Sequence, residues 1–270
     1  MKAVILAGGK GTRITEESRF RPKPMIEIGP HPLIWHIMKT YAAHGITDFV
    51  VCCGYKGFVI KEYFANYYLH NSDVTFDMGR NEMQIHHTTS EPWRVTVVET
   101  GLETMTGGRL KRIEHHLEAK PFCMTYGDGL ANIDITKLLA FHRAHGKLAT
   151  MTTVPAEGRY GAAVIDKGDS ITAFQEKASG GTWINGGYFV LEPRVLDYID
   201  GDDTHWEIEP MRSLVGESEV MAYRHSGFWM AMDHLRKRRY WISCGQKGAR
   251  HGKFGHDRNT NPTRLPSQSL

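Results

Sequence analysis

Residues that could hold a phosphate chain stand near the start of the sequence, in the stretch ILAGGKGTRITEESRFRPKPM at 5–25. An apolar run ends there in Gly8, Gly9, Lys10 and Gly11. Glycines remove side chains where a backbone must turn sharply and come close to a ligand, and exposed backbone N–H groups favour phosphate. The stretch therefore indicates a loop that could bind a phosphorylated ligand.

Two cations follow the glycines: Arg13 ends the phrase GGxGTR, and Lys23 stands ten residues further on. Lys23 lies between Pro22 and Pro24, which fix φ on either side and stiffen the loop that presents the lysine. Two common nucleotide motifs do not fit. In Walker A (GxxxxGK[ST]) the lysine is followed by Ser or Thr, whereas here the lysine precedes a glycine, and the dinucleotide fingerprint GxGxxG would need a glycine where Ile14 stands.

The remaining pattern, GGxGTR with a lysine between prolines, resembles the signature of the sugar-1-phosphate nucleotidyltransferases. The resemblance implies a Rossmann-like α/β/α sandwich in which the glycine loop holds the nucleotide while Arg13 and Lys23 neutralise its phosphates. We therefore interpret the stretch as a triphosphate cradle. The alternative is that the two cations are solvated charges of a surface loop.

A second glycine pair stands in Met105-Thr106-Gly107-Gly108-Arg109, before the predicted helix RLKRIEHHL. The glycines again permit close backbone approach, and Arg109 near a helix start could meet a phosphate or the base. The predicted nucleotide-binding residues are Leu6, Ala7, Gly8, Gly9, Gly11, Thr12, Arg13, Lys23, Thr106, Gly107, Arg109, Gly127 and Asp128.

Nucleotidyl transfer spreads charge over phosphate oxygens, which enzymes meet with positioned cations and with Mg²⁺ held by carboxylates. Asp128, in YGDG, ends an apolar strand, where open α/β sheets bind their ligands; the alternative is an ordinary Asp-Gly turn. Asp233, in GFWMAMDHLR, would by itself suit a helix cap. The resemblance implies that Asp233 is the second metal ligand, so we expect Mg²⁺ at Asp128 and Asp233.

An acid, a base and an amide gather in FQEK at 174–177 and WINGG at 183–187. A sugar phosphate needs a cation for its phosphate, which suits Lys177, and acceptors for its hydroxyls, which suit Glu176 and Asn185. A surface ion pair is the alternative for Glu176 and Lys177. The resemblance implies a sugar-phosphate site made of Gly161, Glu176, Lys177, Asn185 and Gly186, with Arg13, Lys23, Asp128 and Lys177 as the catalytic residues.

The elements that must position these residues follow an α/β pattern. Apolar runs at 3–7 and 48–54 alternate with helical periods at 33–45 and 56–68, which predicts βαβ units and a parallel sheet covered by helices on both faces. Between about 70 and 100 the pattern breaks, because VTFDMG, MQIHHT and VTVVETG alternate like exposed or antiparallel strands. Further on, PFCMTYGDG, LATMTTV, GAAVID and WINGGYFVLEP predict strands, and RLKRIEHHL and DITKLLAFHRAHG predict helices. We expect a Rossmann-like three-layer sandwich with a mixed, mostly parallel sheet and a small antiparallel insertion.

Composition limits the partners. The chain has 270 residues, a formal net charge of only +3 and 23% charged residues, so no basic stripe indicates nucleic acid and an anionic partner should be small. The apolar run near the N-terminus is too short for a signal peptide or a membrane span, so we expect a cytoplasmic protein. Cys52, Cys53, Cys123 and Cys244 show no CxxC spacing, so we expect ordinary buried thiols.

The sequence changes character at its end. Residues 1–236 form the predicted nucleotidyltransferase domain, whereas 237–270 have lost apolar periodicity and form a basic, polar tail. The family typically continues here with an apolar helix, and codons for the tail shifted by one base can encode such an ending. We therefore hypothesise a frameshift near residue 237, which the coding DNA would refute if no one-base shift restores that ending.

Longer phrases sharpen the resemblance, among them GTRITEES, EPWRVTVVETGLETMTGGRLKRI, TYGDGLANIDI and THWEIEPM. They are most similar to the branch of the family that transfers a cytidylyl group from CTP to glucose 1-phosphate, giving CDP-glucose for the dideoxysugars of surface polysaccharide such as O-antigen. That branch implies CTP and glucose 1-phosphate as partners, Mg²⁺ as cofactor and a homo-oligomer. The alternatives are a thymidylyl- or uridylyltransferase, a nucleotide-sugar binding protein without turnover, and an inactive frameshift product.

Overall fold

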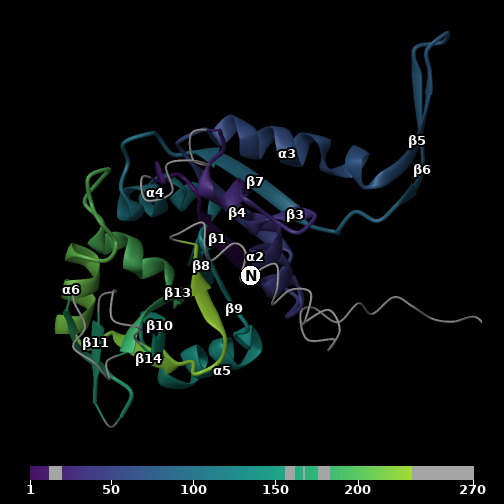
Figure 1. Ribbon diagram of the computed structural model, residues 1–270. Helices are drawn as coiled ribbons and strands as arrows, with labels where there is room; N and C mark the ends of the chain where they lie inside the picture. The colour runs from purple at the N-terminus through teal and green to yellow at the C-terminus, as the bar shows by residue number, and fades with distance from the viewer. Residues whose placement is uncertain (12–19, 156–161, 167, 176–182, 233–270) are drawn as a thin grey trace, which may run out of the picture.

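The computed structural model describes residues 1–11, 20–155, 162–166, 168–175 and 183–232 (Figure 1). Its centre is a run of parallel strands in the order β8-β1-β4-β7. Leu6, the last residue of β1, pairs with Cys52 of β4 and with Tyr126 of β8, so three strands end at one edge of the sheet. The bounds are β1 (Lys2–Leu6), β4 (Asp48–Cys53), β7 (Arg94–Glu99) and β8 (Phe122–Tyr126).

The other half of the sheet is mixed. β13 (Trp183–Leu191) runs antiparallel to β8 and joins it to β10 (Ala149–Pro155), which in turn lies parallel to β14 (Val220–Arg224). β11 (Ala162–Ile165) and β12 (Ile171–Gln175) complete the nine strands of this sheet within the described residues. The sequence prediction of a mixed α/β sheet is thus confirmed.

Both faces of the sheet are covered, which explains why its central strands are continuous apolar runs. In β1, Ala3 and Ile5 pack on one face with α2 and α5, whereas Val4 and Leu6 pack on the other face with α4 and α6. These two cores make the three layers of the predicted sandwich. The helices are α2 (Leu33–Ala42), α3 (Gly57–His70), α4 (Thr106–Arg112), α5 (Ile135–His145) and α6 (Glu209–Gly216), with short 3-10 helices η1 (Lys23–Met25), η2 (Glu114–His116) and η3 (Pro193–Tyr198).

The antiparallel insertion is smaller than the sequence suggested. β5 (Ser72–Asp77) and β6 (Glu82–Thr88) form a hairpin that projects from the end of α3, away from the sheet (Figure 1). VTVVETG, predicted to be exposed or antiparallel, instead forms β7, which pairs in parallel with β4 because Val95 and Val97 pack against the core. Two further short pairs join β2 (Glu27–Ile28) to β3 (His31–Pro32) and β9 (Gly129–Ala131) to β15 (Trp229–Ala231).

Three of the four cysteines are buried free thiols, as predicted. Burial raises the pKa of Cys53 and of Cys123 to about 12, so neither is a reactive thiolate at neutral pH. Cys244 and the predicted tail at 237–270 lie outside the described residues. Within the described part of the chain, no helix is long and apolar enough to cross a membrane.

Candidate active site

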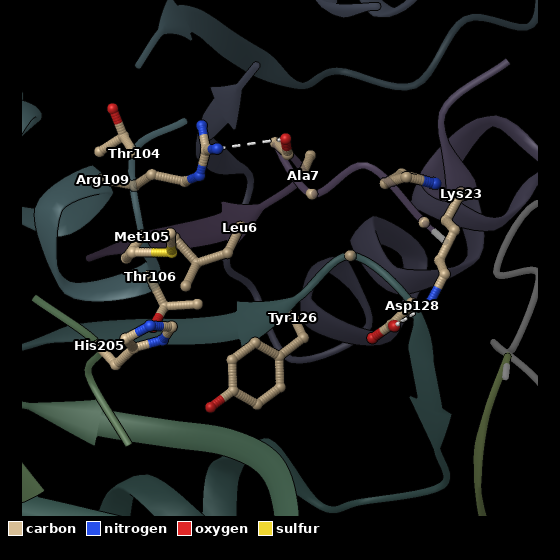
Figure 2. Close-up of a pocket in the computed structure, with 15 residues that line it drawn as sticks. Leu6, Ala7, Lys23, Thr104, Met105, Thr106, Arg109, Tyr126, Asp128 and His205 are labelled. Atoms are coloured by element: carbon tan, nitrogen blue, oxygen red, sulfur yellow. Dashed lines mark hydrogen bonds and ion pairs between the residues drawn. The ribbon is translucent and has the colours of Figure 1, made fainter. Parts of the chain in front are cut away.

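A cavity of about 280 Å³ opens at the edge where β1 and β8 end (Figure 2). Most of the predicted nucleotide-binding residues line it, although they come from four separate segments of the chain. The lining residues are Leu6, Ala7, Gly8, Gly9, Gly11, Lys23, Pro24, Thr104, Met105, Thr106, Arg109, Tyr126, Gly127, Asp128 and His205. Gly107 is not among them, and Thr12 and Arg13 lie outside the described residues.

The glycine loop extends directly from the sheet. The backbone N–H of Ala7 donates to the Cys52 carbonyl at 2.9 Å, and the N–H of Gly127 donates to the Leu6 carbonyl at 2.9 Å. A Cβ at Gly127 would lie 2.7 Å from Pro24 Cγ and 3.0 Å from the Leu6 carbonyl oxygen. Glycine at 127 therefore lets the Asp128 turn close against both the β1 end and the lysine loop.

Lys23 and Asp128 meet at one end of the cavity, where Figure 2 shows their side chains pointing toward each other. Lys23 Nζ lies 3.2 Å from Asp128 Oδ2, although 105 residues separate them in sequence. Lys23 begins η1, and the turn is closed by the Met25 N–H donating to the Pro22 carbonyl at 2.8 Å. Pro24 and Met25 are buried, so the turn is anchored in the core and presents the lysine from a fixed position.

The end of the described chain approaches the same aspartate. The backbone N–H of Met232 donates to the Asp128 carbonyl at 2.6 Å, and Ala231 of β15 pairs with Gly129 of β9. The predicted second metal ligand, Asp233, is the next residue and lies outside the described residues. No group of three or more His, Cys, Asp or Glu side chains that could hold a metal occurs within the described residues.

Arg109 occupies the opposite wall and is only 4% exposed. Its Nη1 donates to the Cys53 carbonyl (3.1 Å), the Thr100 hydroxyl (2.7 Å) and the Gly101 carbonyl (2.7 Å), and Nη2 donates to the Gly8 carbonyl (3.2 Å). Burial lowers the pKa of the guanidinium. Arg109 thus joins the glycine loop to the ends of β4 and β7, a structural role that the sequence did not reveal.

The position of Arg109 also changes the interpretation of Gly8. A Cβ at Gly8 would collide with the guanidinium, and a Cβ at Gly54 would lie 2.6 Å from Nη1. By contrast, nothing lies within 4 Å of a Cβ at Gly9. Glycine at position 8 therefore makes room for the buried guanidinium of Arg109, in addition to the ligand-binding role that the sequence predicts for it.

A polar network forms the wall between Tyr126 and Thr106, and its central residue, Glu207, was not singled out from the sequence. Glu207 accepts from the Tyr126 hydroxyl at 2.5 Å and from the Thr106 hydroxyl at 2.6 Å. Asn185 Nδ2 donates to the Tyr126 hydroxyl at 3.3 Å. Tyr126 and Thr106 line the cavity, so the network connects predicted nucleotide-binding and sugar-binding residues.

Asn185 and Gly186 stand at an irregularity of β13, where the register with β10 shifts between Met151 and Thr153. Gly187 has a φ of +76°, and its N–H donates to Asn185 Oδ1 at 2.7 Å. This bulge turns the amide of Asn185 toward Tyr126. The other predicted sugar-phosphate residues, Gly161, Glu176 and Lys177, lie outside the described residues.

Comparison with known proteins gives consistent results. The family model described as Nucleotidyl transferase matches residues 2–246. The chain is 56% identical over 250 residues to the glucose-1-phosphate cytidylyltransferase of Salmonella typhi, covering 92% of this chain and 97% of that protein. It is 43% identical over 234 residues to a probable glucose-1-phosphate cytidylyltransferase of Bacillus subtilis, covering 86% and 91%. The crystal structure of HddC from Yersinia pseudotuberculosis shares the fold, with a TM-score of 0.73 at 20% identity over 90% of this chain and 99% of that one.

Proposed function

The chain belongs to the nucleotidyl transferase family, and we propose that it transfers the cytidylyl group of CTP to α-D-glucose 1-phosphate, giving CDP-glucose and pyrophosphate. The observation that carries this proposal is the 56% identity to a glucose-1-phosphate cytidylyltransferase over 92% of the chain. The cavity supports it, because a glycine loop, a lysine and an aspartate meet at the carboxyl edge of the sheet, where phosphates bind in α/β folds.

The chemistry is an in-line displacement at phosphorus. An oxygen of the sugar phosphate forms a bond to the α-phosphorus of CTP, and the bond from that phosphorus to the bridging oxygen breaks, so that pyrophosphate leaves with the electron pair. The attacking phosphate is already an anion at neutral pH, so this step needs no general base and no covalent nucleophile. Positioning and charge neutralisation therefore account for catalysis.

Lys23 is the described cation best placed for that task. The side chain is 15% exposed, and η1 fixes the backbone that carries it, so the ammonium meets a phosphate chain with little reorganisation. The ion pair with Asp128 holds the lysine in place before substrate binds. We assign the same neutralising role to Arg13, and to Lys177 the positioning of the sugar phosphate.

Asp128 fits a Mg²⁺ ligand. Its carboxylate is 37% exposed and faces the cavity, and carboxylate oxygens are the ligands that Mg²⁺ prefers. The hydrogen bond from Met232 to Asp128 brings the residue before Asp233 to the same place, so we propose both aspartates as ligands. When bound, Mg²⁺ would neutralise phosphate oxygens and help to orient the triphosphate.

The sugar side of the proposed site combines Asn185 and Gly186 with Gly161, Glu176 and Lys177. Asn185 Oδ1 accepts from the Gly187 N–H, and one hydrogen of Nδ2 goes to the Tyr126 hydroxyl. The second Nδ2 hydrogen is then available for a sugar oxygen. Both substrates are charged phosphates that do not cross membranes unaided, so we propose that the reaction takes place in the cytoplasm.

We also propose that the protein is a homo-oligomer that uses α3 and the β5–β6 hairpin. Phe58 and Tyr68 of α3 are 64% and 49% exposed, and Phe76 and Met83 of the hairpin are 57% and 54% exposed. A two-stranded hairpin that projects alone is marginally stable in water, so another surface is needed to cover its apolar side chains. A second copy of the chain supplies such a surface.

The test of the proposed reaction is identification of its products. The purified chain should convert CTP and glucose 1-phosphate with Mg²⁺ into CDP-glucose, detected by chromatography and mass spectrometry, in equal molar amount with pyrophosphate. Omission of glucose 1-phosphate is the control. Binding of CTP without any CDP-glucose would instead support a nucleotide-sugar binding protein.

A further inference from the structure

An ion pair at the surface joins the glycine loop to the neighbouring wall of the cavity. Lys10 Nζ donates to Glu103 Oε1 at 2.6 Å and to Glu103 Oε2 at 2.7 Å, although 93 residues separate the two in sequence. The residues on either side of Lys10, Gly9 and Gly11, line the cavity, and so does Thr104, which follows Glu103. The ion pair therefore connects two segments that both form the cavity.

Lys10 is the only residue of the stretch 8–11 that has a side chain, because the other three are glycines. Glycine keeps more backbone freedom in a flexible chain than any other residue, so holding a loop of glycines in one conformation costs much conformational entropy. A side-chain contact can restrain this stretch only at Lys10. The partner of Lys10 is therefore the group that can limit the freedom of the loop.

The same two segments are also joined inside the protein. The buried guanidinium of Arg109 donates to the Gly8 carbonyl at 3.2 Å and to the Gly101 carbonyl at 2.7 Å. This inner connection fixes the start of the glycine loop at Gly8. The ion pair of Lys10 with Glu103 holds the loop two residues further on, at the surface.

The wall that carries Glu103 is itself anchored in the fold. The Met105 N–H donates to the Asp202 carbonyl at 2.8 Å, and Thr106 Oγ1 accepts from the Trp206 N–H at 2.9 Å. These bonds fix the backbone directly after Glu103, where α4 begins. The ion pair therefore ties a loop with much backbone freedom to a wall that the fold already holds in place.

The exposure of the ion pair limits the size of its effect. The side chains of Lys10 and Glu103 are 44% and 72% exposed. Ion pairs exposed to solvent contribute little free energy, equivalent to at most about a fivefold change in an equilibrium constant. Such a contact contributes little to global stability, but it can shift the population of loop conformations by the same factor.

We propose that Lys10 and Glu103 are a positioning pair: their contact holds the glycine loop in its binding conformation before a nucleotide enters the cavity. Binding then does not have to order the loop, which raises the affinity for the nucleotide. The inference rests on the proposed function, in which this cavity binds the triphosphate. Neither Lys10 nor Glu103 is among the residues that line the cavity, so the pair acts through the loop between them and the ligand.

Glu103→Ala is the deciding variant, because two explanations predict opposite signs. Removal of a carboxylate near the cavity would by its charge alone tighten the binding of the anionic CTP. Loss of the ion pair weakens binding instead, because the freed loop must be ordered when CTP binds. We expect the Kd for CTP, measured by isothermal titration, to rise about threefold, less than the fivefold limit because the change of charge opposes it.

Glu91→Ala is the matched control. Glu91 accepts from Lys39 at 2.7 Å across 52 residues, and neither residue is among those that line the cavity. E91A thus removes the same charge and breaks a comparable ion pair elsewhere, so its Kd for CTP should equal that of the wild type. A Kd for CTP in E103A that is unchanged or lower than in the wild type overturns the proposal.

Kinetics separate positioning of the loop from a general structural role. In E103A the KM for CTP should rise about threefold, while kcat and the KM for glucose 1-phosphate stay within about twofold of the wild type. Tm should change by less than about 1 °C, as is usual for a surface substitution. A lower Tm together with equal losses for both substrates would show a structural role and overturn the proposal.

Lys10→Ala tests whether the lysine itself binds the phosphates. If Lys10 acts only through Glu103, E103A has little further effect in the K10A background, and the double variant binds CTP as K10A does. If Lys10 contacts the phosphates directly, K10A weakens the binding of CTP while E103A, which releases the lysine, strengthens it. Effects of opposite sign, or effects that add in the double variant, overturn the proposal.

A measurement without nucleotide distinguishes this inference from the proposed function. Amide hydrogens of a loop exchange with solvent from its open conformations. In the ligand-free protein, E103A should therefore raise the exchange rate at residues 9–11 about threefold to fivefold, measured by rapid-quench hydrogen exchange and mass spectrometry. If the wild type binds no nucleotide, the proposed function fails, and exchange alone decides on the ion pair. An exchange rate in E103A equal to that of the wild type overturns the inference.

Discussion

Gly8→Ala tests the structural role that Arg109 gives to the glycine loop. The added Cβ would collide with the guanidinium, which cannot move freely because it donates to Cys53, Thr100, Gly101 and Gly8 itself. Either the methyl group stays and overpacks the site, which costs about 1–3 kcal/mol of stability, or the guanidinium moves and loses a hydrogen bond, which costs about 1.5–3 kcal/mol for a charged donor. We therefore expect a destabilisation of about 2 kcal/mol.

For a chain of this length, a loss of 2 kcal/mol lowers Tm by about 4–8 °C. Circular dichroism melting of the ligand-free protein measures this shift, and a coupled pyrophosphate assay measures kcat/KM for CTP. Gly9→Ala is the matched control, since a Cβ at 9 meets nothing within 4 Å and Gly9 has no left-handed φ. The Tm of G9A should stay within about 1 °C of the wild type, as is usual for a surface substitution.

A double-mutant cycle identifies the cause. If the collision with Arg109 is responsible, G8A should lower Tm much less in an Arg109→Met background than in the wild type, because the guanidinium that the added Cβ meets is absent there. Equal Tm values for G8A and G9A, or a cost of G8A that is the same in both backgrounds, would refute the reasoning.

Three further predictions concern the catalytic pair, acid stability and assembly. Lys23→Ala should lower kcat/KM by about 100-fold or more, as loss of a positioned charge in a transition state does, with Tm nearly unchanged. Lys61→Ala is the control, because Lys61 is a surface lysine paired with Glu99. A kcat/KM of K23A equal to that of the wild type would contradict the role of Lys23. Burial lowers the pKa of His142 and of His145 to about 4, below the unfolded value of about 6.5. Protonation therefore favours the unfolded state, and Tm should fall as pH drops from 6.5 to 4. A His142→Gln variant should show a smaller fall of Tm over this range, and an unchanged profile would show that other groups cause the loss. Met78, in the turn of the hairpin, is 87% exposed, and Met78→Asp should shift the molecular mass measured by light scattering toward that of the monomer. The control is Asp73→Asn, a substitution at an exposed residue of the same hairpin. An unchanged mass for M78D would show that the hairpin does not form the interface.

The elements that carry the site were largely predictable from local pattern. PFCMTYGDG forms β8 and its glycine turn because a short apolar run bounded by glycine has few alternatives in an α/β chain. DITKLLAFHRAHG, predicted to be helical, forms α5; the structure adds that Asp134 accepts from the Lys137 N–H at its start and that Gly146 ends it with a φ of +66°. The contact of Lys23 with Asp128 could not be predicted from local sequence pattern, since the two residues are 105 positions apart in the chain.

Where local pattern failed, tertiary packing was the cause. The predicted helix began at Arg109, but α4 begins at Thr106 and includes Gly107 and Gly108, which are poor helix formers. Both glycines are needed for packing, because a Cβ at Gly107 would lie 2.7 Å from the Thr204 carbonyl oxygen and one at Gly108 would lie 2.5 Å from that of Asp202. No local signal announces such a contact.

Glu207 escaped detection for a similar reason. Its hydrogen-bond partners stand 81 and 101 residues earlier in the chain. A glutamate close to the start of a helix is common, because its charge complements the helix dipole, so the residue type alone indicates no further role. Its one signal was its place in THWEIEPM, a phrase that contributed to the resemblance without indicating a role. The role of Gly8 was likewise hidden, because the sequence shows that a glycine stands there but not which atoms its missing Cβ admits.

The measurement that tests the central claim most directly is pyrophosphate release by the purified chain with glucose 1-phosphate and Mg²⁺, when CTP, UTP, dTTP and ATP are supplied in turn. We predict release with CTP at a kcat/KM well above that for the other three nucleotides. Release with dTTP or UTP in preference to CTP, or no release with any of the four by a chain that folds and binds nucleotide, would contradict the assignment of cytidylyl transfer.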